Sequence, residues 1–335
     1  MTQQTQLEEQ RVLVKDRAVA AILARPPESL WRDAWRRLLR NKASVASGIF
    51  IIVLLIFAVL ADDAVYAWIL GRPAEPLLAP YHFETPDFQA TLASPSLERS
   101  ASGGFPHLLG TDKYGRDVLS RIIYGSRISL AVGVFGSLVI MTFGLFYGSV
   151  SGYLGGRIDS LMMRFVDVMY AFPTLLFIIL LMVILGSTTG AEGIRNLVLG
   201  IGTVSWMGMA RLVRGQFLSL REKEFVEAAR MIGTQDASII TRHLLPNSLG
   251  PIIVSVTLGI PSLIMTEATL SFIGLGVPPP FPSWGQMLND GWRAMRASPH
   301  LIIYPAVILS ITMLTFNFLG DGLRDALDPQ MKGTM

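Results

Sequence analysis

Residues Ile49-Phe-Ile-Ile-Val-Leu-Leu-Ile-Phe-Ala-Val-Leu60 form an unbroken apolar run, and this run decides the class of fold. Extended to about 20 residues, such a run forms a helix long enough to cross the hydrocarbon of a bilayer. The composition agrees, since 51% of the residues are hydrophobic and only 16% are charged, against about 25% charged in a typical soluble domain. The sequence therefore predicts an all-α polytopic membrane protein.

Six stretches have the length and apolarity of a membrane-spanning helix. They are Val45–Ala61, Ile128–Val150, Phe165–Gly186, Ile194–Val213, Leu249–Gly276 and Leu301–Leu319. The fourth is the weakest, because Asn196, Ser205 and several glycines dilute it. More than 40 residues precede the first stretch, and the n-region of a signal peptide is short, so we expect a retained helix.

The distribution of Lys and Arg predicts the orientation of the chain. With the N-terminus inside, 18 of the 28 Lys and Arg residues fall in cytoplasmic segments, 8 fall in outer segments, and 2 lie within the fourth span. The cytoplasmic segments are 1–44, 151–164, 214–248 and 320–335, and the outer segments are 62–127, 187–193 and 277–300. We therefore expect both termini in the cytoplasm.

Apolar residues recur at helical spacing directly before the first span, and arginines occupy the other face. The apolar positions are Leu30, Trp31, Ala34, Trp35, Leu38 and Leu39. This pattern is typical of a helix that lies in the membrane surface with its tryptophans at headgroup depth. The alternative is a cytoplasmic extension of the first span.

The segment between the fourth and fifth spans is long for a membrane protein and has helical character. Gly233 predicts the end of one short helix, Thr234 the cap of the next, and Pro246 the end of that second helix. Ala228, Ala229 and Gly233 leave one face without bulk, which suits the groove of a cytosolic partner. A solvated loop is the alternative that the composition leaves open.

Charges alternate in sign before the second span, at Asp112, Arg116, Asp117 and Arg121. We expect ion pairs among them that order the loop at the outer end of the spans. One alternative is ordinary solvated charge, since exposed pairs contribute only about 0–1 kcal/mol. The other is direct contact with a substrate.

Two charged residues stand three positions apart near the start of the third span. Arg164 and Asp167 share one side of a helix, so we expect a structural ion pair between them. Pro173 follows within the same span and predicts a kink.

Glu267 is the only acidic residue deep within a predicted span. A charge at this depth faces a cavity or a partner, which makes Glu267 a candidate for the lining of a transport pathway. The alternative is a packed carboxyl that Thr266, Thr269 or a neighbouring helix satisfies. Beyond it, the Pro278–Pro282 run and Trp284 predict a rigid re-entrant or surface loop.

Several classes of site have no signature in the sequence. The chain has no Cys, its four His residues are widely spaced, and it carries no Gly-x4-Gly-Lys-[Ser/Thr] phosphate loop. The net charge of +3 is small and follows membrane topology rather than a nucleic-acid surface. We therefore expect no enzyme activity, no metal and no cofactor in this chain.

Four segments, taken together, resemble one family. Glu227-Ala-Ala-x3-Gly233-x9-His243-x-Leu245-Pro246 resembles the EAA motif of ABC importer permeases. That family commonly has Ile at the position of His243, whereas its peptide-importer branch has Arg-His-x-Leu-Pro-Asn, as at Arg242–Asn247. The segments 107–127, 164–173 and 267–288 resemble the C-type inner-membrane subunits of the dipeptide, oligopeptide and nickel importers, in the same order along the chain.

The resemblance implies the type I ABC importer fold, with an accessory first helix and a five-helix core. The expected parts are residues 1–44 as the cytoplasmic segment, 45–61 as the accessory helix, 62–127 as the extracytoplasmic loop, 128–320 as the core and 321–335 as the cytoplasmic tail. Within the core, residues 222–243 would be the coupling loop. Its residues Glu227, Ala228, Ala229, Gly233 and Pro246 would couple the chain to an ATPase.

The resemblance also implies a function and partners. The chain would form half of a translocation pathway in the cell inner membrane, beside a homologous B-type permease subunit. Two cytosolic ABC ATPases and an extracytoplasmic solute-binding protein would complete an importer for peptides. Nickel chelates or other small solutes are alternative substrates, and a proton-coupled secondary transporter that uses Glu267 is the alternative from another class.

Overall fold

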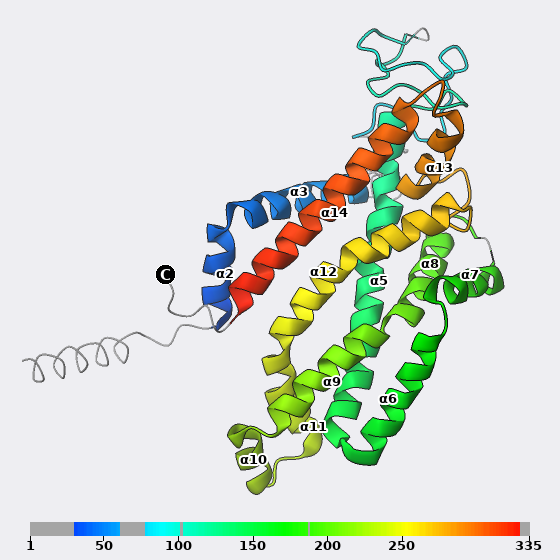
Figure 1. The fold of residues 1–335 in the computed structure, drawn as a ribbon. Helices are drawn as coiled ribbons and strands as arrows, with labels where there is room; N and C mark the ends of the chain where they lie inside the picture. The colour runs from blue at the N-terminus through cyan, green and yellow to red at the C-terminus, as the bar shows by residue number, and fades with distance from the viewer. Residues whose placement is uncertain (1–29, 61–77, 101–102, 187, 329–335) are drawn as a thin grey trace, which may run out of the picture.

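The computed structural model describes residues 30–60, 78–100, 103–186 and 188–328, and within them it is a bundle of apolar helices (Figure 1). Four continuous helices are long and apolar enough to cross a membrane. They are α3 (Lys42–Leu60), α5 (Val118–Leu154), a 37-residue helix over Asp236–Phe272 that contains α11 and α12, and α14 (His300–Leu327). Parts of the predicted N-terminal segment, outer loop and tail lie outside the described residues.

Two further spans are bent helix pairs, which brings the candidates to six. The third predicted span consists of α6 (Gly156–Ala171) and α7 (Thr174–Leu185), whose axes differ by 84°. The fourth consists of α8 (Gly190–Ser205) and α9 (Met207–Arg221), bent by 48° at Trp206. The all-α polytopic fold that the sequence predicts is confirmed.

Pro173 causes the break in the third span, as predicted. Its ring has no N–H to donate and it disfavours helical backbone at the residue before it. Phe172 accordingly takes an extended conformation (ψ 135°) between the two helices. The bend is larger than an ordinary proline kink, and α7 therefore projects sideways from the bundle (Figure 1).

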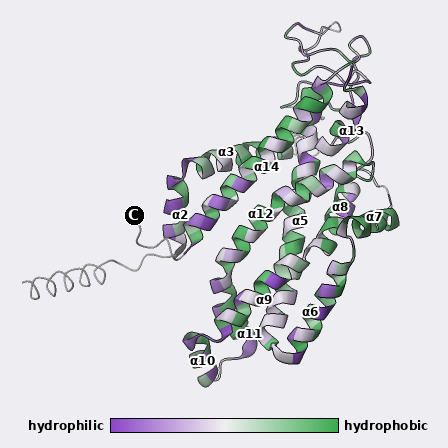
Figure 2. Cartoon of the chain, in the orientation of Figure 1, coloured by the Kyte–Doolittle hydropathy of each residue, from purple (hydrophilic) through white to green (hydrophobic). Residues whose placement is uncertain are grey.

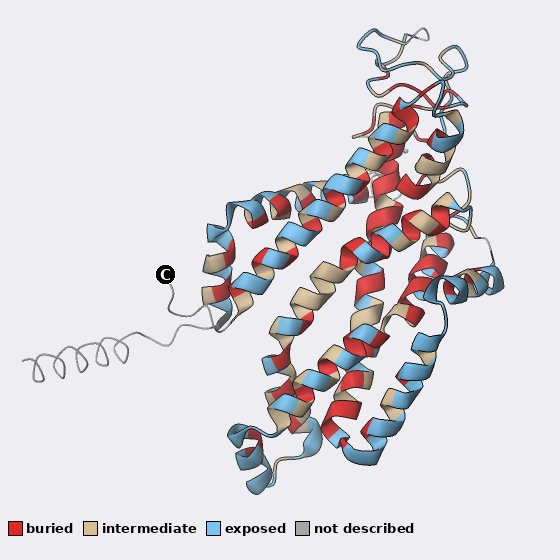
Figure 3. Cartoon of the chain, in the orientation of Figure 1, coloured by how far each residue is buried: buried red, intermediate tan, exposed pale blue. Residues whose placement is uncertain are grey.

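The bundle is centred on α5, which packs against α8, α9, α12 and α3. Buried residues concentrate along α5 and on the faces of α8 and α12 that meet it, whereas α6 and α7 are largely exposed (Figure 3). Most exposed positions on the long helices are apolar (Figure 2), as expected for surfaces that face lipid.

Glycines let α5 and α9 approach closely. Gly144, Gly148 and Gly152 recur every four residues on α5, and a Cβ at each would overlap atoms of α9. The overlap at Gly148 is with the Ala210 backbone carbonyl, which cannot rotate away. Small residues at this spacing are a typical means of close helix packing in membranes.

Trp284 occupies a different place from the one predicted. It opens a helix, α13 (Trp284–Ala294), that packs against α14, α12 and α5 instead of forming a loop. Its ring is completely buried, and its indole N–H donates to the Ile122 carbonyl at 3.1 Å. Ser283 caps this helix by accepting from the Gln286 N–H.

The predicted helix before the first span is α2 (Leu30–Arg40). Ala34 and Leu38 are buried against Ala326 of α14, whereas Trp31 and Trp35 are exposed. Part of the apolar side of this helix therefore packs within the chain. The two tryptophans remain exposed, where a headgroup layer can contact them.

Candidate coupling site

The segment 222–243 begins with a short helix at the end of the bundle. This helix is α10 (Glu224–Met231), and it projects beyond the neighbouring ends of α9 and α12 (Figure 1). Gly233 ends it, as predicted, in a left-handed conformation (φ +78°) that favours glycine. The Gly233 and Thr234 N–H groups close the last turn by donating to the Arg230 and Ala229 carbonyls, each at 3.0 Å.

The next helix is capped by a different residue from the one predicted. It is α11 (Asp236–Ile239), and its N-cap is Gln235, not Thr234. The expectation for Thr234 was wrong by one residue, because Thr234 still belongs to the turn that ends α10 and the chain becomes helical again only at Asp236.

The inner face of α10 packs onto the bundle. Val226 and Ala229 are buried in one cluster with Phe217, Ile239 and Leu244. Ala228, one residue before Ala229, lies about 100° away around the helix and is exposed. The expectation that both alanines share one partner-facing surface is therefore wrong for Ala229.

The outer tip of α10 is apolar and uncovered. Met231 is 90% exposed and Ile232 is 82% exposed, and Phe225 on the same helix is also exposed. Large apolar side chains next to one another on a projecting element mark a contact surface for a partner. Reasoning from the sequence missed this pair, although an apolar pair directly before a helix-ending glycine was a readable signal.

Polar contacts fasten this element to the end of α5. The Tyr153 hydroxyl lies 2.5 Å from Asp236 Oδ1 at the start of α11. Just before this element, Arg221 at the end of α9 donates from Nη1 to the Gly152 and Tyr153 carbonyls, each at 3.4 Å. The contact between Tyr153 and Asp236 joins α11 to the end of α5.

Pro246 does not end the second helix. The backbone continues from α11 through a π-helical turn, Ile240–Leu244, directly into α12 (Leu245–Phe272). Leu245 donates to the Ile240 carbonyl, five residues back, so the wider turn accommodates a proline that has no N–H. The predicted stop was wrong because the π-helical turn before Pro246 changes the hydrogen-bond spacing there, and the helix continues past the proline.

Asp167 pairs with a different cation from the one predicted. Its Oδ1 lies 2.5 Å from Arg211 Nη2 on α9, and Arg164 is not its partner. A second and less exposed carboxylate, Asp159, also bridges α6 to α9. Arg214 donates to both of its oxygens, at 2.5 and 2.6 Å, and Ser151 of α5 donates at 2.5 Å.

Glu267 is enclosed by the bundle. Its side chain is 0% exposed, and its two oxygens accept from Ser129 of α5 and Ser271 of α12, each at 2.7 Å. These contacts favour the packing interpretation of Glu267 over the pathway-lining one. The satisfying hydroxyls are those of Ser129 and Ser271, not those of Thr266 and Thr269, which donate to carbonyls of their own helix.

The charges before α5 form a buried network, as predicted in part. Asp112 Oδ2 lies 2.7 Å from Arg116 Nη2 and 3.6 Å from Arg121 Nε. Asp117 instead caps α5 through the Ser120 N–H at 2.8 Å and meets His107 Nδ1 at 2.9 Å. Since Asp112 and Arg121 are buried, these groups are not the solvated charges of the first alternative.

The aromatic neighbour of this network is Tyr81. Its ring stacks on the His107 ring, with 4.9 Å between the centroids. Burial, followed by the Asp117 carboxylate, raises the pKa of the Tyr81 hydroxyl.

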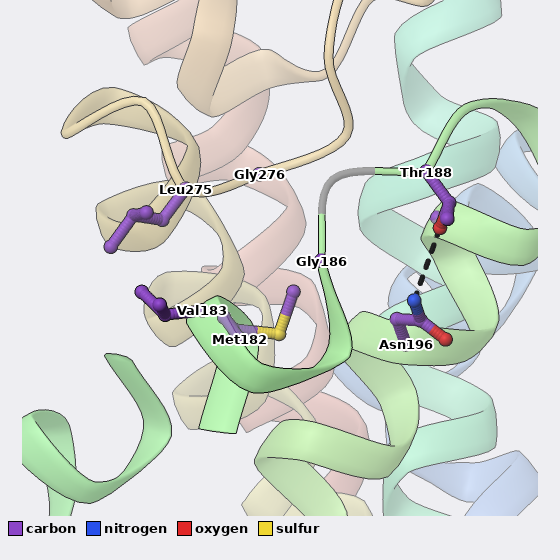
Figure 4. Close-up of a pocket in the computed structure, with 8 residues that line it drawn as sticks. Met182, Val183, Gly186, Thr188, Asn196, Leu275 and Gly276 are labelled. Atoms are coloured by element: carbon purple, nitrogen blue, oxygen red, sulfur yellow. Dashed lines mark hydrogen bonds between the residues drawn. The ribbon is translucent and has the colours of Figure 1, made fainter. Parts of the chain in front are cut away.

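Several cavities open among the described residues. A pocket of about 210 Å³ lies between the end of α7, the start of α8 and the chain after α12 (Figure 4). Asn196 in its wall donates to Thr188 Oγ1 at 3.1 Å. A larger groove of about 870 Å³ runs between α2, α9, α12 and α14. The described residues contain no group of three or more His, Cys, Asp or Glu side chains able to hold a metal ion.

The class of this protein is a membrane permease subunit, and its bundle of apolar helices with a helical element projecting at one end agrees with that class. The chain belongs to the family described as "Binding-protein-dependent transport system inner membrane component", which its residues 140–333 match. Residues 29–95 match a second family, "N-terminal TM domain of oligopeptide transport permease C".

Relatives of known role agree with this membership. The chain is 45% identical over 302 residues to the oligopeptide transport system permease protein OppC of Haemophilus influenzae, a match that covers 90% of this chain and 89% of the relative. It is 42% identical to the dipeptide transport system permease protein DppC of Bacillus subtilis, over 92% of this chain and 88% of the relative. It is also 42% identical to the glutathione transport system permease protein GsiD of Pectobacterium atrosepticum, over 90% of this chain and 92% of the relative.

Among solved structures, an inward-facing MetNI methionine ABC transporter is similar at a TM-score of 0.49 and 21% identity. That match covers 62% of this chain and 96% of the transporter chain.

Proposed function

We propose that this chain is one of two homologous permease subunits in an ATP-driven importer of di- or oligopeptides. The observation that carries the proposal is the α10–α11 element, which presents Met231 and Ile232 to a partner while Tyr153 links it to α5. The resemblance to the EAA motif and the peptide permeases among the relatives support the same assignment.

The proposed partners follow from this assignment. Two cytosolic ABC ATPases would meet the residues 222–243 of this chain and the matching loop of the other subunit. ATP hydrolysis belongs to those ATPases, and this chain transmits their movement without an enzyme activity of its own. An extracytoplasmic binding protein would deliver the peptide from the other side of the membrane.

The orientation and domain boundaries belong to the same proposal. The excess of Lys and Arg in 1–44, 151–164, 214–248 and 320–335 supports an inner-membrane protein with both termini in the cytoplasm. In that orientation the α10 end is cytoplasmic and the described part of the loop 62–127 is outside. The accessory helix over 45–61 would then lie beside a five-helix core over 128–320.

Reconstitution in liposomes tests the proposal. The chain would be purified together with a homologous second permease subunit and the ATPases, and combined with the binding protein. Uptake of labelled di- and oligopeptides would then be measured. We expect uptake that requires ATP inside the liposome and the binding protein outside, with competition by unlabelled peptides. Nickel chelates and glutathione serve as competing substrates that separate the alternatives.

A proton gradient without ATP is the decisive control. The proton-coupled alternative requires an acidic group that protons and substrate reach in turn, whereas Glu267 is enclosed by Ser129 and Ser271. Uptake driven by the gradient alone would contradict the proposed function.

A further inference from the structure

A small pocket lies where the segment before α5, the start of α5, α13 and α14 meet. Its walls include Asp112 and Lys113 of that segment, Val118 and Arg121 of the first turn of α5, and Asp290 of α13. The pocket has a volume of about 20 Å³. A single water molecule needs roughly 10–15 Å³ on this measure, so the pocket has room for one water or one small ion.

This pocket lies in the aqueous part of the molecule. The apolar stretch of α5 begins at Ile128, seven residues after Arg121. Seven helical residues rise about 10 Å, so the pocket stands outside the hydrocarbon, at the end of the molecule opposite α10 (Figure 1). An ion of the surrounding medium can therefore reach this end of the chain without entering lipid.

The guanidinium of Arg121 is buried beside the pocket and lacks a full set of partners. The residue is 2% exposed, and its Nη1 has no hydrogen-bond partner among the described residues. Its Nε lies 3.6 Å from Asp112 Oδ2, which is too far for a hydrogen bond. A buried charge is costly unless it is paired and hydrogen-bonded. The pocket is where a partner for Nη1 fits.

The two carboxylates in the pocket wall are engaged by other groups. Asp112 Oδ1 accepts from two backbone N–H groups at 2.8 and 3.0 Å, and Oδ2 accepts from Arg116 Nε at 2.7 Å. Asp290 Oδ1 accepts from Lys113 Nζ at 3.0 Å. Three cations, Lys113, Arg116 and Arg121, thus face two carboxylates. This group of five side chains keeps one positive charge.

The start of α5 adds to this positive charge. Val118 and Arg121 are the first and fourth residues of a 37-residue helix, and the N-terminus of a helix carries a partial positive charge. Anions bind at helix N-termini for this reason. The unpartnered Nη1, the uncompensated charge and the helix end therefore all indicate an anion as the ligand.

We propose that this pocket binds one small monovalent anion, with chloride as the probe, between Arg121 and the α13 wall. A single negative charge neutralises the group, whereas a water molecule would satisfy Nη1 and leave the charge in place. The volume excludes sulfate, phosphate and the carboxylate of a peptide. The bound anion would join α13 and the segment before α5 to the first turn of α5. This inference does not depend on what the importer carries.

The first test measures the melting temperature of the full chain in detergent while sodium gluconate is replaced stepwise by sodium chloride at constant ionic strength. We expect a saturable rise of a few degrees with chloride, since a ligand that binds only the folded state stabilises it. Ala294→Val adds two methyl groups to the pocket wall and leaves every charge in place, so it should lose this rise. Ala297→Val, at an exposed position after α13, is the matched control and should keep it.

The second test locates the anion in crystals of the full chain grown with sodium bromide. We expect an anomalous bromine peak beside Arg121 Nη1. An ordered water at that place, without the bromine peak, would overturn the inference. A chloride-dependent rise that Ala294→Val retains in full would also overturn it, because the stabilisation would then arise outside the pocket.

Discussion

The Tyr153 hydroxyl lies 2.5 Å from Asp236 Oδ1, which fastens the last turn of α5 to the first turn of α11. At the other end of α5, Asp117 is the N-cap residue, and its carboxylate also contacts His107 in the segment before α5. One 37-residue helix, about 55 Å long, therefore runs from the candidate coupling element to the segment 103–117 that precedes α5. We predict that this helix couples the two ends, because both of its termini are held by hydrogen bonds to the adjoining segments.

Removal of the Tyr153 hydroxyl tests this connection. We expect Tyr153→Phe to fold and insert normally but to transport less substrate for each ATP hydrolysed. The variant loses one hydrogen bond to a carboxylate, which contributes about 1.5–3 kcal/mol. Uptake and ATP hydrolysis would be measured on the same liposomes. Tyr114→Phe is the control, since Tyr114 is an exposed tyrosine in the segment before α5. An unchanged ratio of uptake to hydrolysis would show that the bond carries no coupling.

The apolar tip of α10 should hold the ATPase. Because Met231 and Ile232 are almost fully exposed, M231D/I232D should leave the fold of the chain intact and weaken ATPase binding by about tenfold or more, equivalent to ~1.4 kcal/mol. Co-purification of the ATPase with the detergent-solubilised chain measures this effect. Gln89→Asp adds charge at an exposed position in the segment before α5, far from α10, and should retain the ATPase. Full retention by M231D/I232D would move the docking surface elsewhere.

The glycines of α5 should tolerate no side chain. Gly148→Ala places a methyl group against the Ala210 carbonyl and should destabilise the fold by about 1–3 kcal/mol. Gly215→Ala on α9 is the matched control, because nothing lies within 4 Å of a Cβ added there. That control should be neutral or slightly stabilising, since alanine favours a helix over glycine. Thermal unfolding in detergent distinguishes the two, and equal melting temperatures would argue against close packing of α5 and α9.

Glu267 should behave as a packing residue. Glu267→Gln keeps the size of the side chain, and its amide can accept from one of the Ser129 and Ser271 hydroxyls and donate to the other. Uptake should therefore stay near the wild-type level. Glu267→Ala leaves both hydroxyls without this partner, at about 1–3 kcal/mol for each unpaired group, and should lower the melting temperature. A Glu267→Gln variant that folds normally and loses uptake would restore the pathway role.

Cysteine labelling should establish the topology. Both Ser94, in the segment before α5, and Gln235, beside α11, are exposed on the chain. In intact cells an impermeant maleimide should therefore label Ser94→Cys, on the outside, and spare Gln235→Cys, in the cytoplasm. Permeabilised cells provide the control in which both cysteines react, although a docked ATPase would slow labelling of Gln235→Cys. The opposite pattern would invert the proposed orientation.

Much of this fold is readable from the sequence. Apolar runs such as 49–60 report which segments prefer lipid, because each residue contributes its own transfer free energy wherever its neighbours lie. Pro173 and Gly233 act through their own backbone geometry, so the break in the third span and the end of α10 also follow from local sequence. The resemblance of 227–246 to the EAA motif likewise lies in consecutive residues.

The tertiary structure alone decided which groups meet. Asp167 has Arg164 on its own helix, yet it pairs with Arg211, because α9 lies opposite that face of α6. Ala229 is buried and Ala228 is exposed because only one side of α10 rests on the bundle, and Glu267 is enclosed because Ser129 of α5 faces it. A periodic pattern states what one helix prefers, whereas pairing and burial depend on the helix packed against it, which a local pattern does not encode.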